Sequence, residues 1–165
     1  MKIYPAIEYL GTLDGGSTHP WRVNVKTDQQ APEAYAVKLF STNQVHQHRA
    51  VAKEVFGNVL AKALHLSVPE WALVRFNKKF IDTLPEEVKK QNGKSHQGLR
   101  FASKFHDDFI ICGDQLIASQ LSDYDIPSIY AFDNLVWNID RRANRNKPNL
   151  LLNDDSYLLI DHELI

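Results

Sequence analysis

Three side chains near the C-terminal end of the sequence have the types and order that handling a metal-bound phosphate would need. Asp140 lies in a polar segment after an apolar run, Asn149 directly precedes the apolar residues 150–152, and Asp161 ends a second apolar stretch, 157–160. In phosphoryl transfer, one carboxylate takes the proton of the attacking hydroxyl, while an amide and a second carboxylate hold Mg²⁺. We therefore expect a helix, a loop carrying Asp140, and then a short hairpin that stops at Asp161.

Other interpretations of these residues stay open. Asparagine and aspartate favour turns, so each of the three side chains taken singly could belong to turn chemistry alone. Their combination in this order is what favours the metal–phosphate interpretation. Within the polar loop, Asn144 and Asn146 are alternatives to Asn149 as the metal-binding amide.

The three residues resemble the protein-kinase motifs H-R-D-x-x-x-x-N and D-F-G. Asp140 matches the catalytic-loop aspartate, Asn149 the metal-binding asparagine, and Asp161 the aspartate of D-F-G. The letters N-x-D-R, P-N-L-L-L and L-I-D-H-E are most similar to the HipA-like kinases, a family with phosphoinositide-kinase-type catalytic loops. The chain departs from the kinase pattern in one spacing, because Asn149 lies nine residues after Asp140 instead of five.

A glycine-rich turn near the N-terminus is followed by two candidate strands. Residues 21–26 alternate between apolar and polar, and residues 34–40 form the next strand after a polar turn. In kinases such a turn covers the nucleotide phosphates, because glycines allow close approach and expose backbone N–H groups. The resemblance therefore implies a nucleotide-binding turn made of Gly15, Gly16 and Ser17. The alternative is a plain hairpin loop.

Lys38 and Glu54 complete the implied site. Lys38 follows Ala36-Val37, which is similar to the V-A-I-K motif of kinases, so the resemblance implies that Lys38 pairs with phosphate oxygens. Apolar residues spaced at i, i+4 predict one helix from Asn43 to Leu64, with Asn43 as its N-cap. Glu54, in that helix, is implied to brace the lysine. The alternatives are a lysine on the solvent face of a strand and a solvated glutamate.

Composition excludes several classes of protein. The 165 residues are 44% hydrophobic and 24% charged with a net charge of −1, so there is no general basic field for nucleic acid, and only the loop 141–147 is concentratedly basic. No apolar stretch reaches the length of a membrane helix, and the N-terminus does not resemble a signal peptide. The one cysteine, Cys112, cannot form an internal disulfide. We expect a cytoplasmic protein that binds no membrane.

The resemblance implies an α+β, compact, two-lobe protein-kinase-like fold in a single HipA-like kinase domain over residues 1–165. Residues 1–105 would form the N-lobe-like part, an antiparallel sheet with one long helix, and a further strand is predicted at 71–76. Residues 106–165 would form a reduced, helical C-terminal lobe with the catalytic loop. It is expected to be short because the sequence given stops four residues after Asp161.

The function implied is an ATP-dependent phosphotransferase of the HipA-like type, a Ser/Thr protein kinase that uses Mg-ATP. Its catalytic residues would be Asp140, Lys38 and Glu54, and its metal ligands Asn149 and Asp161. The alternative is a catalytically inactive nucleotide-binding or protein-interaction module with a degenerate kinase fold. A protein substrate or a regulatory protein is the implied partner besides ATP. No residue selects the phosphoryl acceptor, an oligomeric state or a toxin–antitoxin pair.

Overall fold

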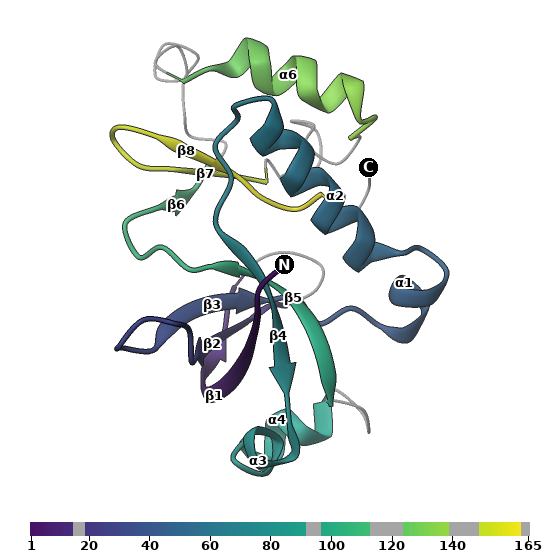
Figure 1. Cartoon of the computed structure of the whole chain (residues 1–165), viewed down its shortest axis with the longest axis vertical. Helices are drawn as coiled ribbons and strands as arrows, with labels where there is room; N and C mark the ends of the chain where they lie inside the picture. Colours follow the sequence, from purple (N-terminus) through teal and green to yellow (C-terminus); the bar gives the residue numbers. More distant parts are fainter. Residues whose placement is uncertain (15–18, 92–96, 113–123, 139–148, 163–165) are drawn as a thin grey trace. The chain divides into compact units, whose positions relative to one another are not determined.

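A computed structural model describes residues 1–14, 19–91, 97–112, 124–138 and 149–162 of the chain (Figure 1). The chain forms two compact units. Unit 1 comprises Met1–Ser41 and Glu70–Phe105, and unit 2 comprises Thr42–Pro69 and His106–Ile165. The segment Thr42–Pro69, which the sequence-based division grouped with residues 1–105, thus has its contacts within unit 2. The two-lobe kinase-like fold and the single domain stay predictions.

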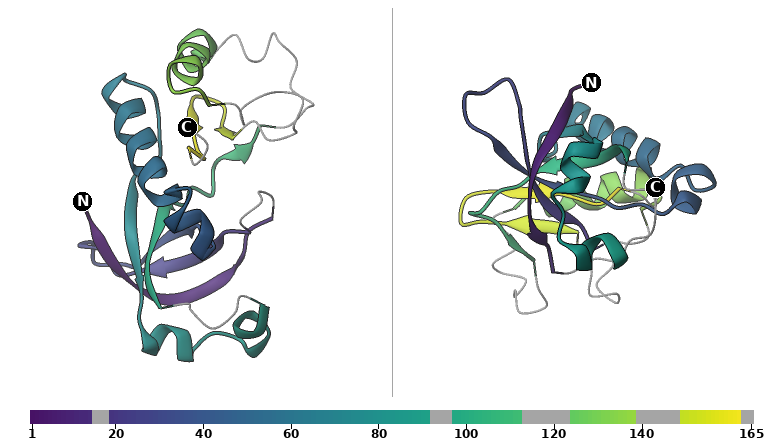
Figure 2. Two further views of the ribbon diagram at one scale, coloured as in Figure 1. Left: turned by 90° about the vertical axis from the view of Figure 1, so that its right-hand side faces the viewer. Right: turned by 90° about the horizontal axis from the view of Figure 1, so that it is seen from below.

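Unit 1 is built around a closed barrel with the strand order β1-β2-β3-β5-β4 (Figure 2). Its strands are β1 (Ile3–Thr12), β2 (Trp21–Val25), β3 (Glu33–Val37), β4 (Trp71–Phe76) and β5 (Gly98–Lys104). The strands predicted at 21–26, 34–40 and 71–76 are therefore present, with shifts at their ends. Neighbouring strands pair antiparallel, except for β1 and β4, which pair in parallel.

The parallel pair closes the barrel because β1 pairs with β4 along one part of its length and with β2 along the other. Its first residues, Ile3 to Pro5, pair with β4, whereas the stretch from Ala6 to Thr12 pairs with β2. The register with β2 shifts twice, between Ala6 and Glu8 and between Tyr9 and Gly11. Such bulges bend a strand and increase its twist, which lets one strand turn from one partner to the other.

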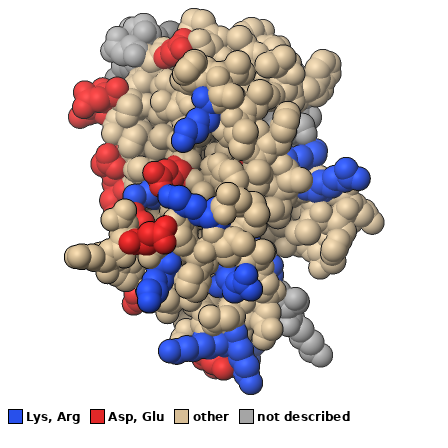
Figure 3. All heavy atoms as spheres, in the orientation of Figure 1, with Lys and Arg blue, Asp and Glu red and all other residues tan. Residues whose placement is uncertain are grey.

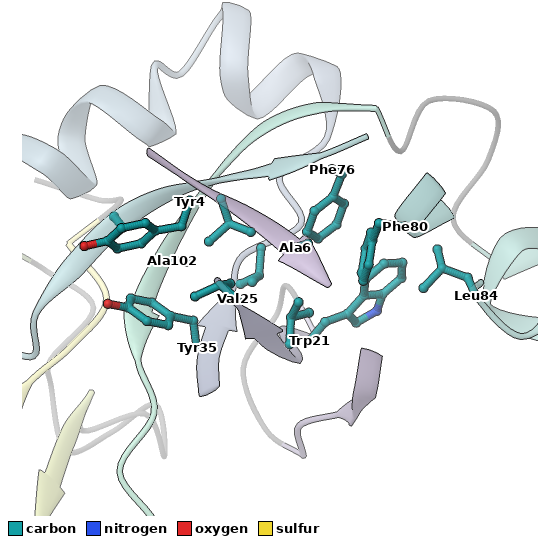
Figure 4. Packing of buried hydrophobic residues seen from close by; sticks show 13 residues of the cluster. Tyr4, Ala6, Trp21, Val25, Tyr35, Phe76, Phe80, Leu84 and Ala102 are labelled. Carbon is teal, nitrogen blue, oxygen red and sulfur yellow. The ribbon is translucent and has the colours of Figure 1, made fainter. Parts of the chain in front are cut away.

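Alternation along the strands fills the barrel core. Trp21, Val23 and Val25 of β2 are buried while the residues between them are less so, which confirms the alternation predicted for this strand. The ring of Trp21 stacks on Phe76 of β4, with 5.8 Å between centroids and 13° between planes (Figure 4). Phe80 adds a third ring, 4.7 Å from Phe76.

Two short helices follow β4 and place Phe80 in this core. They are α3 (Lys78–Asp82) and α4 (Glu86–Gln91). Asn77 caps α3, since its Oδ1 accepts a hydrogen bond from the backbone N–H of Phe80 at 2.9 Å. The cap holds the first turn of α3 so that the Phe80 ring lies beside Phe76 (Figure 4).

Unit 2 combines helices with a small antiparallel sheet. Its elements are α1 (Thr42–His46), α2 (Ala50–Ala63), α6 (Ile126–Leu135), β6 (Ile110–Ile111), β7 (Leu150–Leu152) and β8 (Tyr157–Leu159). The strand order is β6-β7-β8. A second core joins these elements through buried residues of α2, α6 and the sheet, among them Ala61, Phe132, Leu152 and Leu159.

The prediction of one helix from Asn43 to Leu64 is wrong. The segment forms two helices, α1 and α2, and Asn43 lies inside α1 rather than at a cap. The break lies at Arg49, whose φ of 52° is left-handed and interrupts the helical hydrogen-bond ladder. The apolar residues on which the prediction rested lie within α2, so they carry no information about the residues that precede Arg49.

Candidate active site

The structure describes four of the predicted site residues. Lys38 lies in unit 1, while Glu54, Asn149 and Asp161 lie in unit 2. The other predictions, Gly15, Gly16, Ser17 and Asp140, fall outside the described residues, as do the alternatives Asn144 and Asn146.

The hairpin of β7 and β8 brings Asn149 and Asp161 to the same end. Leu150 of β7 is opposite Leu159 of β8, so Asn149 comes next to Ile160. The backbone N–H of Ile160 donates to the carbonyl oxygen of Asn149 at 3.0 Å, which extends the ladder to the residue before Asp161. An amide side chain and a carboxylate side chain therefore leave the backbone at adjoining positions across a hairpin.

Both residues have left-handed backbones. The φ angle is 46° at Asn149 and 63° at Asp161. A residue with a Cβ adopts a left-handed backbone only at a cost in steric energy, although Asn and Asp tolerate this conformation better than other residues do. Non-glycine residues in this conformation gather at functional sites and persist where the surrounding structure holds them. Amide and carboxylate oxygens are also the donors that Mg²⁺ and Ca²⁺ accept, so this pair fits two positions of a hard-cation site.

A buried glutamate lies behind Asp161. Glu54 of α2 is 1% exposed, so the interpretation as a solvated glutamate is wrong. Its Oε1 accepts a hydrogen bond from the backbone N–H of His162 at 3.2 Å, and its own backbone carbonyl accepts from the Nδ2 of Asn58 at 2.9 Å. A buried carboxylate is costly unless hydrogen bonds compensate it, which indicates that α2 uses Glu54 to hold the chain just after Asp161.

The imidazole of His162 is completely buried. Its ring meets Phe132 of α6 edge to face, with 5.9 Å between centroids and 89° between planes. Together with the hydrogen bond that its N–H donates to Glu54, this contact fixes the residue after Asp161 to two helices of unit 2. The sequence prediction assigned no part to His162, although its place directly after Asp161 in the motif was the available signal.

Asn138, two residues before the predicted catalytic Asp140, is also held by hydrogen bonds. Asn138, which is 5% exposed, donates through its backbone N–H to the carbonyl oxygen of Asp133 at 2.8 Å. Its Nδ2 donates to the Asp133 Oδ1 at 3.2 Å. Asn138 is the first letter of the N-x-D motif, so an anchored asparagine lies two residues before the predicted catalytic aspartate.

Lys38 continues β3 in unit 1. Its backbone N–H donates to the carbonyl oxygen of Phe101 at 2.9 Å, and its Nζ lies 5.7 Å from the centroid of the Phe40 ring. The neighbours Val37 and Leu39 contact the barrel core, as predicted from strand alternation. Lys38 is half-buried, so it is not a lysine on a fully solvated face.

Among titrating groups of unit 2, Tyr157 departs from its ordinary behaviour. Burial raises the pKa of its phenol, and a hydrogen bond with the backbone of Ser67 opposes that shift. The hydroxyl is therefore neutral at physiological pH. The Tyr157 side chain packs against the core of unit 2 at the turn end of the hairpin. Within the described ranges, no three residues of the types His, Cys, Asp and Glu come together as a metal site.

Comparison with known proteins agrees with the motifs. The family model of HipA-like kinases matches residues 6–165, which is nearly the whole chain. Curated proteins and solved structures gave no match. Across the residues described, no helix combines the length and apolar character that crossing a bilayer requires. On the family match, the chain belongs to the HipA-like kinase family.

Proposed function

We propose that this chain transfers the terminal phosphoryl group of Mg-ATP to a serine or threonine hydroxyl of a protein. The observation that carries the proposal is the hairpin end, where Asn149 and Asp161 adjoin through the Ile160–Asn149 hydrogen bond. Glu54 supports it, because its carboxylate holds the N–H that follows Asp161. Because the chain belongs to a kinase family, we interpret this pair as ligands for the Mg²⁺ of Mg-ATP.

Each site residue would have a separate role in the transfer. Asn149 and Asp161 would hold Mg²⁺, which neutralises charge on the phosphates when bound, and Asp140 would accept the proton of the attacking hydroxyl. Lys38 would pair with phosphate oxygens, while the turn of Gly15, Gly16 and Ser17 would cover the phosphates. Such catalysis depends on positioning and on electrostatic stabilisation. A cytoplasmic location accords with the single, buried cysteine.

Thermal unfolding with ATP, with and without Mg²⁺, tests the metal–nucleotide site. We expect a Mg-dependent rise in Tm for the unmodified chain that disappears in Asp161→Asn. The matched control is Asp155→Asn, which makes the same change at an exposed position in the turn of the same hairpin. An undiminished Mg-dependent shift in Asp161→Asn would contradict the assignment.

Phosphoryl transfer is tested separately, with γ-labelled ATP and an array of Ser- and Thr-containing peptides. We expect labelled peptides with the unmodified chain and none with Asp140→Asn, while Asp140→Asn keeps the Mg-dependent rise in Tm. The second candidate, a nucleotide-binding module without transferase activity, is favoured by the nine-residue interval between Asp140 and Asn149. It would predict the same Tm shift but no labelled peptide for the unmodified chain.

A further inference from the structure

Helix α2 buries its small and polar residues and exposes large apolar ones. Its buried positions are Ala50, Glu54, Gly57, Asn58 and Ala61. By contrast, Phe56 is 59% exposed and Val59 is 52% exposed. This reverses the pattern of a helix that lies on a finished surface, where the large apolar side chains face inward.

The exposed face of α2 forms one wall of an apolar groove, and the end of α6 forms the other. The groove has a volume of about 590 Å³ and is lined by Arg49, Ala52, Lys53, Phe56, Leu60, Leu135 and Val136. Leu135 is 67% exposed, and Figure 3 shows the surface over α6 mostly without Lys, Arg, Asp or Glu. A continuous apolar surface of this kind marks an interaction site, whereas single exposed apolar residues do not.

The shape of the groove favours an elongated occupant. The lining positions on α2 run from Arg49 to Leu60, which corresponds to roughly 16 Å or three helical turns. An amphipathic helix presents apolar side chains at i, i+4, i+7 and i+11 over the same length. The apolar floor of Phe56 and Leu60 offers little to the phosphates of a nucleic acid.

Charge at one end of the groove selects the sign of the occupant. Arg49 is exposed and Lys53 is partly exposed, and neither has an ion-pair partner within the described ranges. The first turn of α2 contains no acidic residue, so the positive end of the helix dipole adds to these two charges. The acidic side chains of the two helices are engaged elsewhere, Glu54 with His162 and Asp133 with Asn138.

The same charges disfavour a second copy of the chain. In a two-fold interface the groove of one copy would face the groove of the other, whose lining contains no acidic residue to meet Arg49 and Lys53. We propose that the groove between α2 and α6 docks an amphipathic helix of a partner protein. Its apolar stripe covers Phe56, Leu60 and Leu135, and acidic residues at one end of it meet Arg49 and Lys53.

The first test is a selection from displayed 16-residue peptides. The peptides carry Leu at i, i+4, i+7 and i+11, and the other positions vary among Ala, Gln, Glu and Lys. We expect selection on the chain to enrich peptides with Glu clustered at one end. Failure to enrich any peptide, or enrichment of basic or uncharged ones, would overturn the proposal.

The second test measures the best peptide, labelled with fluorescein, by anisotropy. We expect Kd to rise at least tenfold for Phe56→Ser and for the double variant Arg49→Glu/Lys53→Glu, while Lys62→Glu, on α2 outside the groove, leaves it unchanged. A peptide with its clustered Glu changed to Lys should bind the double variant at least tenfold more tightly than it binds the unmodified chain. Equal affinities across these variants would contradict the groove as the site.

Two further measurements separate other occupants, and circular dichroism verifies that each variant is folded. Sedimentation of the unmodified chain should give one protomer. A dimer that Phe56→Ser dissociates would assign the groove to a second copy and overturn the proposal. Binding to vesicles of phosphatidylserine and phosphatidylcholine that is lost in Phe56→Ser would assign it to a membrane surface, with the same consequence, whereas absence of binding supports the helix.

Discussion

The carboxylate of Glu54 and the backbone N–H of His162 are hydrogen-bonded at 3.2 Å, although the two residues are 108 positions apart in the chain. Through this bond α2 determines where the chain goes after Asp161. The backbone before Asp161 is held by a second bond, from the N–H of Ile160 to the carbonyl oxygen of Asn149. The left-handed conformation of Asp161 is thus enclosed between two hydrogen bonds.

Replacing Glu54 should separate the role of its charge from its role as an acceptor. Glu54→Ala should destabilise unit 2 by about 1–3 kcal/mol, because the buried N–H of His162 loses its acceptor. Glu54→Gln keeps an oxygen in place and should be less damaging. Urea unfolding followed by circular dichroism measures both, and equal losses for Ala and Gln would argue against the acceptor role.

The buried ring of His162 should contribute to stability through its contact with Phe132. His162→Ala should lower the free energy of unfolding by about 2–4 kcal/mol, since it leaves a cavity in the interior of unit 2. The comparison is His46→Ala at an exposed position of α1, which should change stability by less than about 0.5 kcal/mol. Similar effects of the two substitutions in urea unfolding would contradict the packing assignment.

The backbone of Asp161 allows a test that is independent of its side chain. Asp161→Gly and Asp161→Ala both remove the carboxylate, but only glycine adopts a φ of 63° without a steric cost. We expect the glycine variant to be more stable than the alanine variant by about 1 kcal/mol in denaturant unfolding. Neither variant should show the Mg-dependent rise in Tm with ATP. A more stable alanine variant would show that the conformation carries no strain.

An ion pair between the neighbouring strands β3 and β5 should make stability depend on pH. Lys104 Nζ lies 2.6 Å from Glu33 Oε1. Hydrogen bonds from Lys104 and then Thr27 hold the pKa of Glu33 below its ordinary 4.5, and the bond to Glu33 raises the pKa of Lys104 above its ordinary 10.5. The contribution of Glu33 is therefore complete above its unfolded pKa and disappears as pH falls through its lower folded pKa.

At the alkaline end the sign reverses. The contribution of Lys104 is complete below its unfolded pKa and is lost as pH rises through the raised folded value. Because the pair is partly exposed, we expect roughly 0.2–1 kcal/mol from it at neutral pH. Urea midpoints of the unmodified chain and of Glu33→Gln should converge as pH falls below the folded pKa of Glu33. A constant difference down to acid pH would exclude the pair as its source.

Some of the architecture could be predicted from residue patterns. Strand alternation in Trp21, Val23 and Val25 identified both β2 and the face that is buried, because apolar residues at every second position are typical of an extended strand with one covered face. The division between α1 and α2 could not be predicted in this way, since it depends on the left-handed backbone of one residue, Arg49, which its residue type does not reveal. The parallel pairing of β1 with β4 could not be predicted from residue patterns either, because it depends on two bulges in the backbone of β1.

The identities of the candidate site residues could be predicted from the sequence, but their contacts could not. The motif singled out Asn149 and Asp161, and the hairpin between them followed from the apolar stretches. Whether Glu54 was buried or solvated could not be decided, since periodicity alone does not show which face of α2 is covered. The acceptor role of Glu54 toward His162 depends on packing between segments distant in sequence, which residue types do not reveal.

The double pairing of β1 also has a consequence for association between chains. Among the described residues of unit 1, the closed barrel leaves no edge strand, so the paired N–H and C=O groups of its strands are unavailable as a template for strands of another molecule. That protection depends on the short parallel contact of Ile3 to Pro5 with β4. Loss of these few residues from the barrel would uncover an edge of β4 and an edge of β1 together, and a small change at the N-terminus would thereby turn a self-contained barrel into an aggregation-prone sheet.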